Sequence, residues 1–458
     1  MPVFFLRPFK EGDDAPCDEN EDIQELMMRQ CRSTFLFCYQ SKLMADVLEK
    51  YGRSAVCLDA TSKTTDSALP LFLLVVKTPL CYMIVGAFMV QFETSSCIAE
   101  ALEMFRTWNK ELNPVYFMID CCQAEIAAIK FVFAQSKIML CDFHREQAWE
   151  RWMRRKEKGV TDREGALSLL RRLAHATSCD EFEAAYKSLR ESEFWENQRL
   201  KEYMLPYWIP VSHMWVKYYR QQLSVVITTN NGTESQNKLL KQFYLQGGHG
   251  RKSLTGIIAV LVNQFFPDRH QHFCQENIRR SSCYRKYHEG IPHYLQNRPP
   301  SAVNHIMNRF EAALCYGKGD VTRGHETRIF TLKSSVPGKF HTVDFNSPSC
   351  SCQDFAQTKL PCKHFCAVFQ HDTIFTFDSL PKEYKSGPLL ALDRFDLISK
   401  GGSAISPPES GAETHQLDSN SLPKRKKHSL YKVRGSLREN ADKVKGMAMY
   451  CTDKDKLD

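Results

Sequence analysis

The spacing of apolar positions between residues 54 and 145 predicts a sheet with helices between its strands. The longest apolar stretch, 69–90, is interrupted by Lys77 and Pro79, so neither half reaches the ~20 residues that a membrane span requires. We therefore expect two buried strands in this stretch, joined by a turn at the letters KTPLC, and no membrane as a partner.

The rest of this region continues the alternation of strands and helices. Further strands are expected at 54–61, which holds Asp59 near its end, at 114–120, which stops at Asp120, and at 136–141. Helices are expected over 94–112, with Ile98, Leu102 and Phe105 at helical spacing, after Asp120, with Ile126, Ile129 and Phe133 on one face, and from near Asp142. The order of three strands, helix, strand, helix, strand and helix is that of an RNase H-like fold. It places Asp59 and Asp120 at the ends of strands that could be neighbours.

Residues 145 to 225 show helical spacing without strand patterns. One apolar stripe consists of Leu167, Leu170 and Ala174. Ser178 followed by Glu181 predicts a capping box at the start of the next helix. We interpret this interval as an all-helical insertion into the sheet domain.

A third acidic residue follows the insertion. The letters NNG at 230–232 predict a turn, after which Asn231 or Thr233 can cap a helix that carries Glu234 in its first turn. Helical spacing puts Asn237 on the same face as Glu234.

Asp59, Asp120 and Glu234 could therefore converge. Converging carboxylates repel one another and become stable when divalent cations neutralise them. Mg²⁺ or Mn²⁺ would suit such oxygen ligands, and two ions about 3.5–4 Å apart can activate a water for attack on a phosphodiester. The alternative is that the aspartates pair with Lys or Arg, while Glu234 stabilises the N-terminus of its helix through the macrodipole.

A cluster of soft ligands lies further along the chain. Cys350 and Cys352 form one closely spaced pair, and Cys362 and His364 form another. About four such ligands on turns bind Zn²⁺ tetrahedrally, so we predict one zinc ion here. A hairpin is expected over 326–345 before the cluster, and a short helix is expected from 363 to 371.

The order Cys-x-Cys, a gap of nine residues, then Cys-x-His resembles the SWIM zinc finger. Cys366 lies outside this order, and we interpret it as a packing residue of the helix rather than a fifth ligand.

Several motifs upstream of the finger resemble the core of Mutator-like element (MULE) transposases. These motifs are LDAT around Asp59, MIDCCQAEIAAIKFVFAQSKIMLCDFH over 118–144, and NNGTESQNKLLK around Glu234. The run LCDFHREQAWERW over 140–152 is similar to animal SWIM zinc-finger proteins derived from such transposases. The resemblance spans roughly residues 50 to 370.

This resemblance implies that Asp59, Asp120 and Glu234 correspond to a catalytic acidic triad. It also implies that Cys141 and His144 form the Cys-x-x-His pair of that family, which supports the site or contacts DNA. A core thiol and a histidine at a helix start are the alternative for this pair.

The sequence departs from the transposase pattern in two respects. The second motif reads IDCCQAE where many transposases have Gly and another acid after the aspartate. The chain also begins almost at the core, without the N-terminal DNA-binding domain that usually reads transposon ends. These departures argue against autonomous transposition, by either truncation or domestication.

The domain organisation follows from these patterns. We predict an N-terminal segment, the first part of the RNase H-like core, the helical insertion, the completion of the core with the Glu-bearing helix, the zinc finger, and a mostly disordered basic tail. Their expected bounds are 1–50, 51–145, 146–225, 226–320, 321–372 and 373–458.

Composition and charge indicate the cellular compartment of the protein. The 18 cysteines are scattered, and the first residues hold too short an apolar run for a signal peptide, so a reducing compartment is expected. The net charge is +8, and the tail carries the basic run Lys424 to Lys427, which is typical of nuclear import signals or phosphate-contacting arms.

Three functional hypotheses follow. The first is a domesticated, transposase-derived nuclear protein that binds zinc and associates with DNA or chromatin. The second is an active metal-dependent DDE transposase or strand-transfer enzyme. The third is a scaffold that binds protein partners through the SWIM finger.

Overall fold

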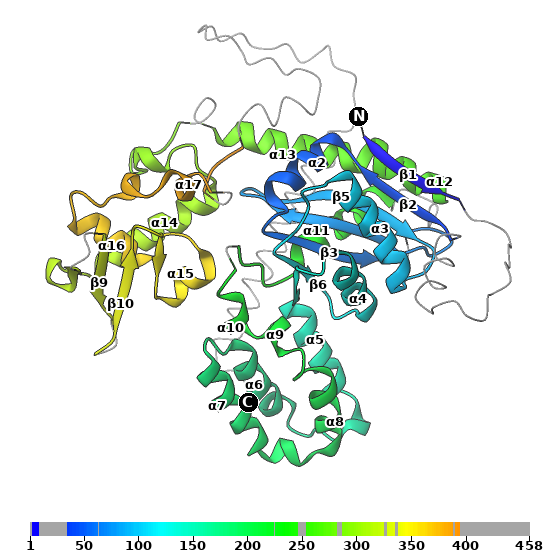
Figure 1. Cartoon of the computed structure of the whole chain (residues 1–458), viewed down its shortest axis with the longest axis horizontal. Helices are drawn as coiled ribbons and strands as arrows, with labels where there is room; N and C mark the ends of the chain where they lie inside the picture. Colours follow the sequence, from blue (N-terminus) through cyan, green and yellow to red (C-terminus); the bar gives the residue numbers. More distant parts are fainter. Residues whose placement is uncertain are drawn as a thin grey trace, which may run out of the picture. The chain divides into compact units, whose positions relative to one another are not determined.

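The structure is a computed structural model of the whole chain (Figure 1). It describes residues 2–8, 34–62, 64–223, 225–245, 253–281, 286–324, 328–334, 338–387 and 390–393. Residues 394–458 of the expected disordered tail, with the basic run at 424–427, lie outside these residues, whereas residues 373–387 and 390–393 of it are described and include a short helix at Lys382–Lys385.

A seven-stranded mixed sheet organises the first part of the chain, drawn in blue and cyan in Figure 1. Its strands are β1 (Val3–Arg7), β2 (Leu36–Gln40), β3 (Ala55–Thr61), β4 (Leu71–Lys77), β5 (Tyr82–Val90), β6 (Tyr116–Ile119) and β7 (Lys137–Leu140). Their spatial order is β1-β2-β5-β4-β3-β6-β7. The pairs β3–β6 and β6–β7 are parallel, and the other neighbours are antiparallel. The predicted mixed α/β fold is confirmed, including the two strands on either side of KTPLC.

Strands β1 and β2 extend the sheet in a segment for which the sequence analysis predicted no element. All five residues of β2 are buried, and β2 pairs with β5. The helix α2 (Lys42–Tyr51) follows β2, with Ser41 as its N-cap. Strand β1 pairs only with β2 among the described strands, and its Phe4 side chain is 68% exposed.

Helices cover both faces of the sheet. Successive residues of β4 point to opposite faces, so Phe72 and Leu74 join one core cluster while Leu71 and Leu73 join the other. The first cluster contains apolar residues of α2, α3 (Ser95–Trp108) and α4 (Gln123–Val132). The second contains residues of the helices that follow the insertion. Burial on both faces explains why the strand sequences are continuously apolar.

The described residues between β7 and α11 form helices joined by turns and loops, with no strand. The α-helices of this insertion are α5 (Asp142–Met153), α6 (Arg163–His175), α7 (Cys179–Arg190), α8 (Gln198–Tyr207), α9 (Ser212–Trp215) and α10 (Lys217–Arg220). Trp149, Trp208 and Trp215 pack edge to face in its core. The expected stripe of Leu167, Leu170 and Ala174 is buried.

The capping box predicted at the start of α7 forms only in part. The Ser178 hydroxyl accepts a hydrogen bond from the backbone N–H of Glu181, as expected. The Glu181 carboxylate, however, accepts from the backbone N–H and the hydroxyl of Thr177 instead of the N–H of Ser178. The Glu181 side chain therefore caps the N–H of the residue that precedes the N-cap, instead of the N–H of the N-cap itself.

Helical segments complete the second face of the sheet. They are α11 (Asn231–Leu239), η3 (Leu240–Leu245), α12 (Leu254–Val260), η4 (Leu261–Phe265) and α13 (Phe266–Arg280). Asn230 occupies the N-cap position of α11, one residue before Asn231 and three before Thr233, the two caps that the sequence predicted. Gly232 allows the first turn of α11 to lie against β5, since a Cβ at this position would come within 2.2 Å of the Tyr82 ring.

The last described part contains a small sheet with its own core. The strands β8 (Val321–Arg323), β9 (Ile329–Lys333), β10 (Phe340–Asp344) and β11 (Ser349–Cys350) lie in the order β11-β10-β9-β8. Strands β9 and β10 pair antiparallel, which confirms the expected hairpin. The helices are α14 (Pro300–Ala313), α15 (Gln353–Thr358), α16 (Lys363–His371) and α17 (Lys382–Lys385). The helix predicted over 363–371 is thus confirmed.

Candidate metal centres

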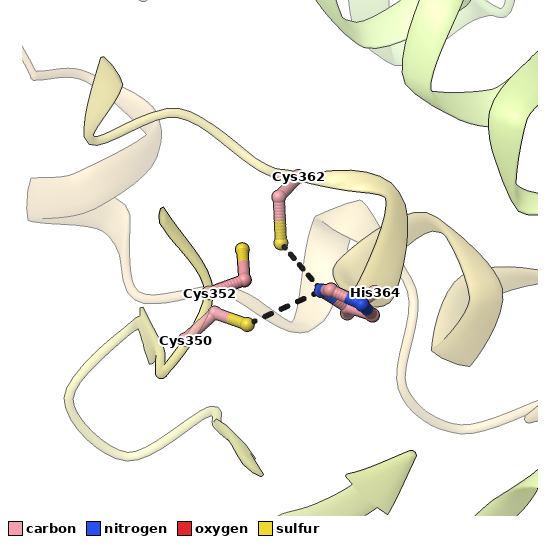
Figure 2. A group of neighbouring side chains, drawn as sticks. All are labelled: Cys350, Cys352, Cys362 and His364. Atoms are coloured by element: carbon pink, nitrogen blue, oxygen red, sulfur yellow. Dashed lines mark hydrogen bonds between the residues drawn. The ribbon is translucent and has the colours of Figure 1, made fainter. Parts of the chain in front are cut away.

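The four predicted zinc ligands come together in the small sheet and its helices. Cys350 ends β11, Cys352 is the N-cap of α15, Cys362 is the N-cap of α16, and His364 lies in the first turn of α16. One ligand atom of each residue lies within 4.8 Å of the others, and all four residues are buried. Figure 2 shows the sulfurs of Cys350 and Cys362 directed toward Nδ1 of His364, at 3.6 and 3.7 Å.

The chemistry of this group fits Zn²⁺. Three thiols and one imidazole nitrogen are the donor set of tetrahedral structural zinc sites. Hydrogen bonds from the Cys350 and Cys362 thiols lower the pKa of Cys352, and the Cys352 bond raises the pKa of Cys350. In the metal-free protein the sulfurs thus share protons, which a cation would displace.

Neighbouring groups hold the ligands in place. The His341 ring lies 4.2 Å from the His364 ring, centroid to centroid. Arg309 of α14 makes two 2.8 Å hydrogen bonds to the Asp354 carboxylate in the first turn of α15. Cys366 is fully buried and lies outside the ligand group, as a packing residue would.

The second candidate centre lies on the large sheet, where β3 and β6 run parallel. Asp59 is 8% exposed near the end of β3, and Asp120 directly follows β6. Helix α11 is fixed to β3, because the Asn230 side chain donates to the Leu58 carbonyl at 3.1 Å. This hydrogen bond places the helix that carries Glu234 beside the strand that carries Asp59.

His144, in the first turn of α5, connects two of the three acids. Its Nδ1 lies 2.5 Å from Oδ1 of Asp120, and its Nε2 lies 3.3 Å from Oε1 of Glu234. The contact with Asp120, followed by that with Cys141, raises the pKa of His144 to about 10. The ring is therefore an imidazolium at neutral pH, and its charge offsets the repulsion between the two carboxylates.

Asp59 has a different environment from Asp120. Its Oδ2 accepts a hydrogen bond from Asn237 Nδ2 at 3.0 Å. Burial, then the charge of Asp120, raises the pKa of Asp59 to about 7. The Glu234 charge acts in the same direction, so the three acids influence one another electrostatically.

Cys141 supports the position of α11. Its sulfur accepts a hydrogen bond from the backbone N–H of Asn230 at 3.2 Å. Ligand atoms of Asp120, Cys141 and His144 also lie within 4.8 Å of one another. The Cys-x-x-His pair thus contacts both the second aspartate and the start of the helix that carries Glu234.

The structure bears on the alternative of simple charge pairing. The recorded partners of the acids are an amide for Asp59 and an imidazole for Asp120 and Glu234, rather than Lys or Arg. The sequence analysis placed Asn237 on the same face as Glu234 by helical spacing, but it did not identify Asn237 as the partner of Asp59.

Comparison with known proteins identifies both parts of the chain. Residues 15–139 match the family model "Zinc finger SWIM domain-containing protein 1/3, RNaseH-like domain". Residues 341–372 match the SWIM zinc finger. A comparison with curated proteins gave no significant match.

The fold and the buried Cys₃His group define a zinc-finger protein with an RNase H-like domain. The two matches support a SWIM-domain protein of the group formed by zinc finger SWIM domain-containing proteins 1 and 3. No helix within its described residues has both the length and the apolar character needed to cross a membrane.

Proposed function

We propose that this zinc-binding protein derives from a transposase and acts in the nucleus in association with DNA or chromatin. The observation that carries the proposal is the contact of His144 with both Asp120 and Glu234 on an RNase H-like sheet, with Asp59 near enough for the charges of these groups to shift its pKa. This arrangement agrees with the resemblance to MULE transposases, in which three acids occupy the corresponding motifs.

The bridging imidazolium favours a domesticated protein over an active transposase. A two-metal site needs carboxylates that are free to bind cations. Here His144 contacts both Asp120 and Glu234, so a divalent ion would have to compete with the imidazole for these carboxylates. The three acids can therefore persist in the sheet even if the protein performs no catalysis.

DNA binding is the direct test of the proposed association. Lys238 is exposed on α11, one turn beyond Glu234, where a DNA phosphate could approach the site. The full chain should bind duplex DNA in fluorescence anisotropy, with an affinity that falls steeply as salt rises. Lys238→Ala should reduce the slope of log K against log[salt] by about 1, whereas exposed Lys156 of the insertion should change it little when replaced by Ala. Absence of binding at low salt would contradict the proposal and favour a protein-binding scaffold.

Nuclear location rests on the run Lys424 to Lys427, which lies outside the described residues. Replacing its basic residues with Ala should move a tagged protein out of the nucleus. A protein that stays nuclear after the replacement would show that this run is not the import signal.

Metal-dependent DNA cleavage is the second candidate function, and the convergence of the three acids favours it. Asp59, Asp120 and Glu234 would hold Mg²⁺ or Mn²⁺, which would supply an activated water and charge stabilisation. The test is Mn²⁺-dependent nicking of supercoiled DNA by the wild type and by Asp120→Asn. Nicking that Asp120→Asn abolishes would establish the enzyme, whereas equal nicking in both, or none in either, leaves the domesticated function.

A further inference from the structure

A third group of ligand-type side chains lies at the N-terminus of α4. Cys122 is the N-cap of this helix, and Glu125 lies in its first turn. Glu93 is contributed by the turn between β5 and α3. A carboxylate oxygen of each glutamate and the sulfur of Cys122 lie within 4.8 Å of one another. None of these residues belongs to the acidic triad or to the zinc finger.

Glu125 is the unusual member of this group. Its side chain is 2% exposed, and its Oε2 atom is inaccessible to solvent without a hydrogen-bond partner. A buried carboxylate without a partner is strongly unfavourable, because it loses its hydration and gains nothing in return. Such a group is stable in a well-packed core only if it is protonated or if a cation compensates its charge.

No protein cation provides that compensation within the described part of the chain. None of the ion pairs between described side chains involves Glu93 or Glu125. The three side chains differ in solvent exposure: Glu93 is exposed, Cys122 is half-buried and Glu125 is buried. A solvated cation could therefore enter from the Glu93 side and reach the buried carboxylate.

We propose that Glu93, Cys122 and Glu125 form a second metal site for a divalent cation of the Zn²⁺ class. A thiolate with two carboxylates suits a borderline cation, whereas Mg²⁺ and Ca²⁺ prefer oxygen ligands alone. Three protein ligands leave a fourth tetrahedral position for water, which the exposed side of Glu93 keeps accessible. This site lies at the N-terminus of α4, in the segment CCQAE, where the sequence differs from the usual transposase motif.

The experiment is zinc titration of the full-length protein in competition with a chromophoric chelator. Cys122→Ser should remove one equivalent of bound Zn²⁺, and Glu125→Gln should remove the same equivalent. Cys121→Ser is the matched control, because this neighbouring cysteine is exposed and outside the group, and it should bind zinc like the wild type. Loading with Co²⁺ should give a thiolate-to-cobalt absorption component that Cys122→Ser lacks and Cys121→Ser retains.

Two further variants separate this site from the other centres. Cys362→Ser should lose the finger's equivalent and keep the one at Cys122. Asp120→Asn should also keep it, although ligand atoms of Asp120, Cys141 and His144 lie close enough to hold an ion of their own. Far-UV circular dichroism checks that each variant is folded. Identical zinc stoichiometry and cobalt spectra for Cys122→Ser, Glu125→Gln and Cys121→Ser would overturn the proposal.

Discussion

The acidic cluster on the large sheet and the Cys₃His cluster of the finger both gather ligand side chains, but they differ in what else holds those side chains. Asp59 has Asn237 and Asp120 has His144 as partners within the protein. In the finger, the sulfurs of Cys350 and Cys362 have His364 as their recorded partner, so ligand contacts ligand. On the sheet, the two aspartates therefore contact other side chains of the protein, whereas in the finger the ligands contact one another.

The size of the surrounding core explains this difference. The sheet is covered on both faces by two large apolar clusters. The finger's cluster is smaller and includes three of the four ligands themselves. Small domains bury too little surface to be stable alone, and structural zinc supplies the missing folding free energy. We infer that removal of metal unfolds the finger but leaves the large sheet folded.

The largest expected effect is that of Cys362→Ser. This variant should lose the finger's Zn²⁺ and unfold the finger locally, because metal binding supplies most of its folding free energy. Elemental analysis measures the zinc, and hydrogen exchange compares amides of β9, β10 and α16 with those of β3 and β4. The amides of the large sheet should stay protected.

Cys366→Ser is the control for this change. Cys366 lies on the same helix and is equally buried, but it is not in the ligand group. It should keep zinc while losing some packing. Wild-type protein that is purified without zinc, or a Cys362→Ser finger that stays protected, would remove the contrast between the regions.

A smaller effect is expected on the sheet from Asp59→Asn in metal-free buffer. Since the pKa of Asp59 is raised to about 7, the folded state holds this proton more tightly than the unfolded chain. Ionisation between about pH 4 and pH 7 therefore costs stability, at most about 4 kcal/mol at about 1.36 kcal/mol per pH unit. Asp59→Asn should melt above the wild type at pH 8, and the gain should vanish near pH 4. A gain of equal size at both pH values would show that the charge of Asp59 is not its cause.

Gly232→Ala tests how closely the sheet positions α11. The added Cβ would lie 2.2 Å from the Tyr82 ring, so the helix or the ring must move. Overpacking of this kind costs typically about 1–3 kcal/mol, measured by denaturant unfolding. Gly319→Ala near the finger is the control, because its Cβ would meet no atom within 4 Å. Equal stability of the two variants would show that α11 adapts freely.

The sequence predicted the fold best where burial leaves a clear pattern. Strands β4 and β5 are apolar throughout because both faces of the sheet are covered, and Lys77 and Pro79 mark the turn between them. Strand β2 shares this pattern but is only five residues long, and an isolated short run does not distinguish strand from helix. Strand β1 was missed because its edge position leaves it largely exposed.

The candidate sites were predictable to different degrees for a similar reason. The zinc ligands are close in sequence, so their spacing alone indicated the site. The meeting of Asp59 with Asp120 followed from parallel neighbouring strands. The bridge by His144 depends on the start of α5 and on side-chain orientation, and the isolation of Glu125 depends on its neighbours in space. Neither the contacts of His144 nor the isolation of Glu125 can be recognised from a pattern in the sequence.

The smallest expected effect concerns the ion pair between Arg309 and Asp354, which links α14 to the finger helix α15. Both side chains are about one-third exposed, at 32% and 30%, so solvent screens their attraction. Partly exposed pairs contribute about 0.2–1 kcal/mol, and Asp354→Asn should lower the stability of the zinc-loaded finger by no more than that. Zinc stoichiometry should be unchanged, and the deficit should shrink as salt rises. Hydrogen exchange of α16 in the two proteins measures it. Release of zinc by Asp354→Asn would contradict this expectation. It would show that the contacts between the helices, rather than the metal, are the main source of the finger's stability.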